Sequence, residues 1–130
     1  MNTKPRWKLR FNNYEQAYQR LAEAVTRKKY DKLETAGLIQ TFTFTFELGW
    51  KTLKDLLVQE GFDIKTPRQT IKQAFQAGFI KDGKLWLEAL DKRNIMAHIY
   101  DEKESNAAIK LIKNKYFSML KDLYLFLKQK

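Results

Sequence analysis

Cysteine is absent from this sequence, and histidine occurs only once. The chain therefore forms no disulfide and offers no thiolate to a metal, and one histidine argues against a structural zinc site, so we expect neither metal nor cofactor. Long apolar runs are also missing, since none approaches the ~20 residues that cross a bilayer. No signal-peptide core follows the N-terminus, which predicts a cytoplasmic protein without membrane contact.

Turn-forming residues are scarce as well, with 5 glycines and 2 prolines in 130 residues. Few turns imply long elements, and a short chain holds few long elements, which favours a helical bundle. Hydrophobic residues make up 44% of the chain, which is enough for a buried core. We predict an all-α fold, an up-and-down antiparallel bundle of about five helices, in a single domain spanning residues 1–130.

The net charge is +10 and is spread along the chain. Residues 1–65 carry 12 basic and 8 acidic side chains, and residues 66–130 carry 13 and 7. This excess favours contact with RNA, a nucleotide or an acidic protein partner. An ordinary lysine-rich surface explains the same charge, so composition alone leaves the partner open.

Apolar side chains at helical spacing predict five helices. The third has a strong start signal, with Thr66 as N-cap, Pro67 in the first turn and Gln69 completing a capping box. Its apolar side chains, Ile71, Ala74 and Phe75, form a predicted buried face. Asp82 is the predicted N-cap of the fourth. The expected ranges are 13–28, 33–60, 66–78, 82–97 and 105–129.

The alternation of threonine and phenylalanine over residues 41–46 is typical of a strand. The flanking residues instead indicate a helix, because an apolar seam continues through the segment at steps of three and four. This seam comprises Leu38, Phe42, Phe46, Trp50, Leu53 and Leu57. Phe44 falls off the seam, so we expect it to face another helix or a partner subunit.

The segment from Arg93 to Tyr100 holds the most reactive combination of side chains in the sequence. The imidazole of His98 can take a proton from a ribose 2′-hydroxyl or give one to a leaving 5′-oxygen. The guanidinium of Arg93 can stabilise charge on phosphate oxygens, and Asn94 can orient the imidazole or bind phosphate. Together these residues form a candidate catalytic site that needs no metal.

Helix geometry limits how the candidate site can assemble. Positions five apart on a regular helix diverge by about 140°, so Arg93 and His98 meet only if the helix kinks or ends near Ala97, or if two copies of the chain face each other. The alternative is structural: His98 caps the helix, and Arg93 pairs with a nearby acid, namely Asp91, Glu88 or Asp101. We expect Glu47 and Lys51 to form a surface pair on the second helix.

The spacing from Arg93 and Asn94 to His98 resembles the Arg-polar-x-x-x-His signature of the HEPN superfamily. The segment from Phe44 to Lys54, Phe-Thr-Phe-Glu-Leu-Gly-Trp-Lys-Thr-Leu-Lys, resembles a second hallmark of the subgroup called nucleotidyltransferase substrate-binding proteins. Thr66-Pro67-Arg68 and Trp86 also look similar to this subgroup. Gly49 stands where many relatives are expected to carry alanine, a change that permits close helix packing.

The resemblance implies a helical bundle that forms a homodimer or a larger homo-oligomer. It also implies a separate partner chain, a minimal nucleotidyltransferase, in a toxin–antitoxin-like pair. Arg93 and His98 would be nuclease residues, and Tyr100 would be the hydroxyl that the partner adenylylates to silence them. An alternative role is a non-catalytic subunit that presents a substrate or nucleotide to the transferase. Tyr100 also has a plain alternative, as a packing residue with its hydroxyl in water.

Overall fold

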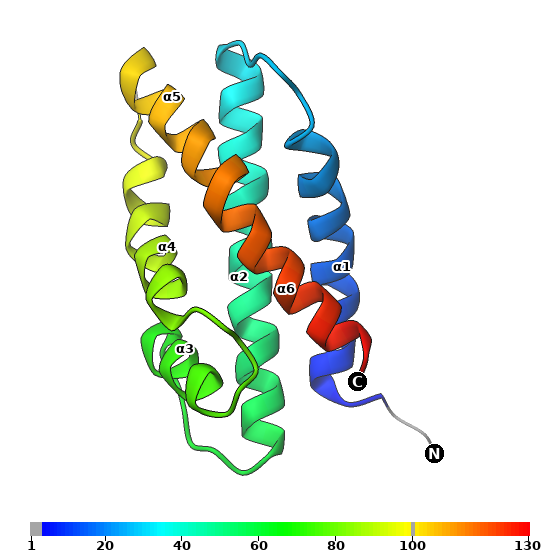
Figure 1. The fold of residues 1–130 in the computed structure, drawn as a ribbon. Helices are drawn as coiled ribbons and strands as arrows, with labels where there is room; N and C mark the ends of the chain where they lie inside the picture. The colour runs from blue at the N-terminus through cyan, green and yellow to red at the C-terminus, as the bar shows by residue number, and fades with distance from the viewer. Residues whose placement is uncertain (1–3, 100) are drawn as a thin grey trace.

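The computed structural model describes residues 4–99 and 101–130, and every regular element in these ranges is helical. Three long helices run alternately up and down in Figure 1, and the C-terminal helix crosses in front of α1 and α2. Because α5, η1 and α6 follow one another without a break, the chain forms five helical rods, as predicted. The elements are α1 (Arg6–Ala24), α2 (Lys32–Gln59), α3 (Pro67–Gln76), α4 (Gly83–Met96), α5 (Glu102–Leu111), the π-helical turn η1 (Ile112–Tyr116) and α6 (Phe117–Lys128).

Side-chain caps fix where several helices begin. The hydroxyl of Thr66 accepts from the backbone N–H of Gln69, and the Gln69 side chain reaches back to Thr66, which is the predicted capping box. Asp82 caps α4 as predicted by accepting from the backbone N–H of Leu85 at 3.0 Å. Asp31 and Glu34 form a second capping box at the start of α2.

Two of the predicted helices had wrong boundaries. The first helix begins at Arg6 and ends at Ala24, because Trp7 and Phe11 extend its buried stripe toward the N-terminus. The last rod begins at Glu102 instead of at residue 105, so the acidic residues Glu102 and Glu104 belong to its first turn. Asp101 accepts from the backbone N–H of Glu104 at 2.6 Å, and the acidic side chains of this turn favour a helix N-terminus.

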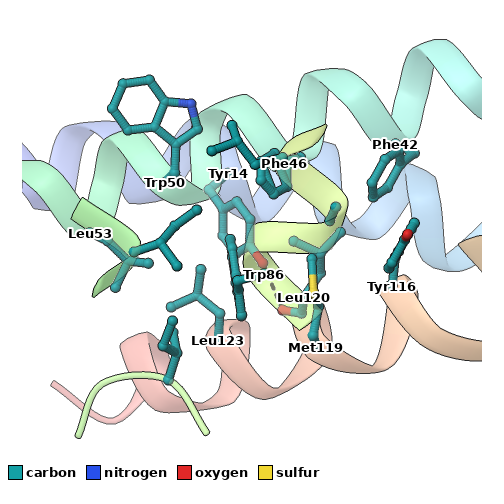
Figure 2. Close-up of a cluster of buried hydrophobic side chains, with 14 of the residues drawn as sticks. Tyr14, Phe42, Phe46, Trp50, Leu53, Trp86, Tyr116, Met119, Leu120 and Leu123 are labelled. Atoms are coloured by element: carbon teal, nitrogen blue, oxygen red, sulfur yellow. Dashed lines mark hydrogen bonds between the residues drawn. The ribbon is translucent and has the colours of Figure 1, made fainter. Parts of the chain in front are cut away.

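The apolar seam of α2 forms the centre of the core, which confirms the helical interpretation of the threonine–phenylalanine segment. Phe42 and Phe46 are fully buried and contact Tyr116 and Trp86, with ring centroids 5.3 Å apart in both pairs. Figure 2 shows these rings between α2 and the C-terminal rod. Phe44 lies off the seam as predicted and keeps 56% of its surface exposed.

Gly49 lets α2 approach its neighbours closely. A Cβ atom at this position would lie 3.0 Å from Tyr14 and 3.3 Å from Leu123, so α1 and α6 pack directly against the helix backbone. Tyr14 is itself fixed, because its buried hydroxyl donates to the carbonyl oxygen of Leu120 at 2.6 Å. This contact, drawn in Figure 2, ties α1 to α6 across the core.

Phe75 was wrongly predicted to belong to the buried face of α3. Its side chain is 52% exposed, whereas Thr70, Ile71 and Ala74 are fully buried. The Phe75 ring covers Gly83 at the start of α4, where a Cβ atom would lie 3.1 Å from the ring. Because Gly83 has no side chain, the Phe75 ring can pack over it at the surface. No helix in the described ranges is long and apolar enough to cross a membrane.

Candidate functional site

The histidine segment lies where α4 ends and the chain turns toward α5, at the end of the bundle opposite the two termini (Figure 1). The last residue of α4 is Met96, and Ala97 is its C-cap. The backbone N–H of His98 donates to the carbonyl oxygen of Ile95 at 3.0 Å, which closes the turn. His98 is exposed, so its imidazole is accessible from solvent.

Arg93 points toward α2, where it forms an ion pair with Glu47. The two side chains are 19% and 30% exposed, so the pair is largely withdrawn from water. The guanidinium carbon also lies 6.0 Å from the centre of the Phe46 ring. Partial burial lowers the pKa of Arg93 by removing water from the charged group, but an arginine still keeps its charge at neutral pH.

Glu47 is the residue that connects the site to the rest of α2. One carboxylate oxygen pairs with Arg93, and the other accepts a hydrogen bond from the indole N–H of Trp50 at 3.0 Å. The expected surface pair with Lys51 was wrong, because Glu47 turns toward α4 instead. Two helices therefore contribute to holding the Arg93 guanidinium.

The acids proposed as alternative partners of Arg93 are engaged elsewhere or lie apart from it. Asp91 pairs with Arg68 of α3 at 2.9 Å, and Glu88 accepts from the hydroxyl of Tyr116 at 2.6 Å. Asp101 caps α5. The structural alternative thus named the wrong partners, since the counter-ion comes from a different helix.

A mostly apolar groove runs between α2 and the turn that carries His98. Its α2 wall comprises Ala36, Ile39, Gln40, Thr43, Phe44 and Glu47, and its other wall comprises Met96, Ala97 and Ile99. His98 lies between the last two of these residues in the chain, and Glu47, the partner of Arg93, lies on the opposite wall. The groove is thus bordered on one side by the chain neighbours of His98 and on the other by the counter-ion of Arg93.

Not all of the predicted site residues meet within one chain. In the described ranges no hydrogen bond or ion pair joins Arg93 to His98, because the guanidinium is engaged by Glu47. Asn94 is exposed on α4, and the helix ends before His98, so the two no longer share a regular helical face. Tyr100 lies outside the described residues.

Comparison with known proteins decides the family. The model of the family described as "Nucleotidyltransferase substrate binding protein like" matches residues 9–129. The chain belongs to this family. That match places it in the HEPN subgroup that its Arg-polar-x-x-x-His segment and its Phe-Glu-Leu-Gly-Trp-Lys segment resemble.

One similar protein supports the family assignment, and a solved structure supports the fold. A protein of Haemophilus influenzae named "Probable ribonuclease HepT" is 32% identical over 77 residues, which are 55% of this chain and 53% of that protein. The match thus spans about half the length of the curated relative. A crystal structure of a protein from Thermus thermophilus superposes with a TM-score of 0.79 at 27% identity, covering 89% of this chain and 97% of that one.

Glu47 was the functional candidate that sequence reasoning missed. The only local clue was its place in the Phe-Glu-Leu-Gly-Trp-Lys segment, which carried the resemblance without indicating a role. Its partner lies 46 positions further along the chain, so helical spacing could not reveal the pair. Within this nucleotidyltransferase substrate-binding family member, Glu47 is best described as a residue that positions Arg93.

Proposed function

We propose that this chain is a metal-independent endoribonuclease whose catalytic residues are Arg93 and His98, with Asn94 beside them. The observation that carries the proposal is the placement of the two residues: His98 is exposed on the turn after α4, and Arg93 of the same helix is held by Glu47, which lines the groove beside that turn. The similarity to a protein named a probable ribonuclease supports it.

In the proposed reaction, the nucleophile is a hydroxyl group of the RNA itself. A base removes the proton of a ribose 2′-hydroxyl, the 2′-oxygen attacks the adjacent phosphorus, and the bond to the 5′-oxygen breaks as that oxygen receives a proton. The products are a 2′,3′-cyclic phosphate and a 5′-hydroxyl. His98 serves as base or acid, and Arg93 stabilises the charge that develops on the phosphate oxygens.

One histidine does not readily act as base and acid in the same step, so we propose that the working form is a homodimer. The surface around the groove offers apolar area for a second copy: Phe44 and Ile95 are 56% and 59% exposed, and Leu33 is 83% exposed. Exposed apolar side chains of this size on neighbouring elements are typical of protein interfaces. Two copies joined here would bring two His98 turns to one cleft.

The proposed partner is a minimal nucleotidyltransferase, in a toxin–antitoxin-like pair. We propose that it transfers AMP from ATP to the Tyr100 hydroxyl, with release of pyrophosphate and of the hydroxyl proton. The phosphodiester formed two residues from His98 would place negative charge and bulk beside the imidazole, which repels the RNA backbone and silences cleavage.

The test is cleavage of bulk RNA in EDTA by the wild type, His98→Ala and Arg93→Ala. Lys92→Ala, which removes an exposed charge from the same helix, is the matched control. We expect cleavage by the wild type and by the control, and loss of at least about a hundredfold in the other two. Cleavage that survives in His98→Ala, or that requires added metal, would overturn the proposal.

The second candidate function is a non-catalytic subunit that presents a substrate or nucleotide to the transferase. The description of the family favours it, and the apolar groove offers a surface for docking. It predicts a stable complex with the transferase and no RNA cleavage by the wild type. Size-exclusion chromatography of the two chains mixed at micromolar concentration, run beside the cleavage assay, separates the two functions.

A further inference from the structure

A second groove, which is basic where the first is mostly apolar, lies between the start of α1 and the C-terminal half of α2. We call it the basic groove and define it by Arg6, Arg10, Lys51, Lys54 and Asp55, with Trp50 also among its lining residues. Four cations and one acid line it, so its formal charge is +3. It shares no lining residue with the apolar groove.

The charge of the basic groove is not neutralised by its own acid. Arg10 donates to Asp55 at 2.7 Å, and this pair is well shielded, with Asp55 only 11% exposed. The salt bridges formed by residues 4–99 and 101–130 include none to the remaining cations, Arg6, Lys51 and Lys54. Three positive charges are therefore left for an anionic ligand.

The basic groove is connected to the candidate active site through α2. Glu47, Lys51 and Lys54 follow one another at steps of four and three, so they lie along one face of the helix. At 1.5 Å per residue, Lys54 lies about 10 Å along the axis from Glu47. Trp50 lines the groove and donates to Glu47, which in turn pairs with Arg93.

The cations of the basic groove are open to solvent, although Trp50 between them and Glu47 is buried. Figure 2 shows the Trp50 side chain on the side of α2 away from Leu120 and Leu123 of the C-terminal rod. Lys51 and Lys54 are only half-buried, and Arg6 is exposed. The cations of the groove are therefore available to an anionic ligand.

We propose that the basic groove binds the phosphate backbone of single-stranded RNA on one side of the scissile bond. This inference rests on the proposed nuclease function and adds to it the path that the substrate takes across the molecule. The three unpaired cations, Arg6, Lys51 and Lys54, can each contact a backbone phosphate. Phosphate contacts carry no sequence information, so we expect the groove to position RNA without a sequence preference.

A second cluster of lysines supplies a matched control. Lys28, Lys29, Lys110 and Lys113 surround Tyr30 where the α1–α2 connection meets the C-terminal rod. This lysine cluster is also basic, but within the described ranges no hydrogen bond or salt bridge links it to Glu47 or Arg93, and Lys113 already donates to the carbonyl oxygen of Arg27 at 2.6 Å. If net charge alone attracted RNA, both clusters would contribute equally.

The experiment measures binding of a fluorescein-labelled oligouridylate of about 15 nucleotides by anisotropy, between about 50 and 300 mM KCl. All proteins in this binding assay carry His98→Ala, so the RNA stays intact. Each phosphate contact on a single strand contributes a slope of about −0.7 to the logarithm of affinity against the logarithm of salt concentration. Lys51→Gln/Lys54→Gln should therefore reduce the slope by about 1.4, and weaken binding roughly 20-fold at about 100 mM. Lys28→Gln/Lys110→Gln should change neither the salt slope nor the affinity.

Gln matches Lys in helix propensity, and thermal melting checks that each variant is folded. Equal weakening by the two double variants, unchanged binding by Lys51→Gln/Lys54→Gln, or no binding by the parent at about 50 mM salt would each overturn the proposal. Cleavage is compared between the wild type and Lys51→Gln/Lys54→Gln, both with His98 intact. If both cleave RNA equally well, the basic groove is rejected as an RNA site and the nuclease function is retained. If RNA binding depends on the groove but the wild type cleaves no RNA, the nuclease function is rejected and the RNA-binding site is retained.

Discussion

Arg93 of α4 forms an ion pair with Glu47 of α2, and this pair joins the candidate catalytic arginine to the longest helix of the bundle. The partner carboxylate is held from its other side by the indole N–H of Trp50, so its position is set by two contacts. The guanidinium is thereby restrained between α4 and α2 before any substrate binds. Restraint of this kind reduces the entropy lost when a phosphate is engaged.

Glu47→Gln should lower both stability and activity. The change leaves the partly buried guanidinium without its counter-ion, which should cost about 1–2 kcal/mol of unfolding free energy. Arg93 then loses its fixed position, and RNA cleavage should fall by roughly tenfold or more. Urea denaturation and an initial-rate assay measure the two effects. Glu60→Gln, an exposed position just after the same helix, should change stability by less than about 0.5 kcal/mol; equal effects of the two changes would refute the role of the pair.

Phe44→Ser should weaken self-association while leaving the fold intact. Phe44 is 56% exposed beside the apolar groove, so the change removes apolar area from the proposed dimer face and almost none from the core. Sedimentation velocity should show a shift from dimer toward monomer. Phe75→Ser is a matched control, since Phe75 is 52% exposed on α3. A dimer unaffected by Phe44→Ser, or equally affected by both, would rule out this face.

Gly49→Ala should destabilise the protein although alanine favours helix. The added Cβ would lie 3.0 Å from Tyr14 and 3.3 Å from Leu123, and Tyr14 is held by its hydrogen bond to Leu120. Overpacking should exceed the helix-propensity gain of ~1 kcal/mol and leave a net loss of about 1 kcal/mol. Gly37→Ala, in the same helix with no atom within 4 Å, should instead gain up to about 1 kcal/mol. Denaturant titrations that show the same sign for both would contradict the packing argument.

Buried tyrosines should make the fold sensitive to alkaline pH. Burial raises the pKa of Tyr14 well above 10.0, so the folded state keeps its proton where the unfolded chain loses it. Its contribution to stability is complete below about pH 10 and declines above it, by up to about 1.4 kcal/mol per pH unit. Tyr14→Phe should remove that part of the decline between about pH 10 and 11, at the cost of the hydrogen bond to Leu120 at neutral pH. Parallel pH profiles for the wild type and Tyr14→Phe would be inconsistent with this coupling.

The helices were predictable wherever the signal was local. The seam from Leu38 to Leu57 outweighed the strand-like alternation because a helix buries every seam residue on one side, whereas a strand would have turned Leu53 and Leu57 to the face opposite the other four. The capping box at Thr66 and the cap at Asp82 were readable for the same reason, since both depend on residues within three positions. The start of the last rod was misplaced because Asp101 was considered as a partner of Arg93 and not as the cap of the following helix.

The features that the sequence did not predict depend on tertiary contacts. Phe75 carries the right spacing for a buried face, and only the proximity of Gly83 explains its surface position. The ion pair of Arg93 with Glu47 joins two helices, so no spacing within either helix could reveal it. The candidate residues Arg93, Asn94 and His98 were identifiable from the sequence, but how they are held was not.

The most direct test of the account is whether cleavage depends on the ribose 2′-hydroxyl and on His98. A ribo-oligonucleotide with one mapped cleavage position is compared, in EDTA, with its twin that carries a single 2′-deoxynucleotide at that position. The account predicts that the wild type cuts the first and leaves 2′,3′-cyclic phosphate ends, spares the twin, and loses activity on replacement of His98 by alanine. Equal cleavage of the two oligonucleotides, or undiminished cleavage by His98→Ala, would contradict it.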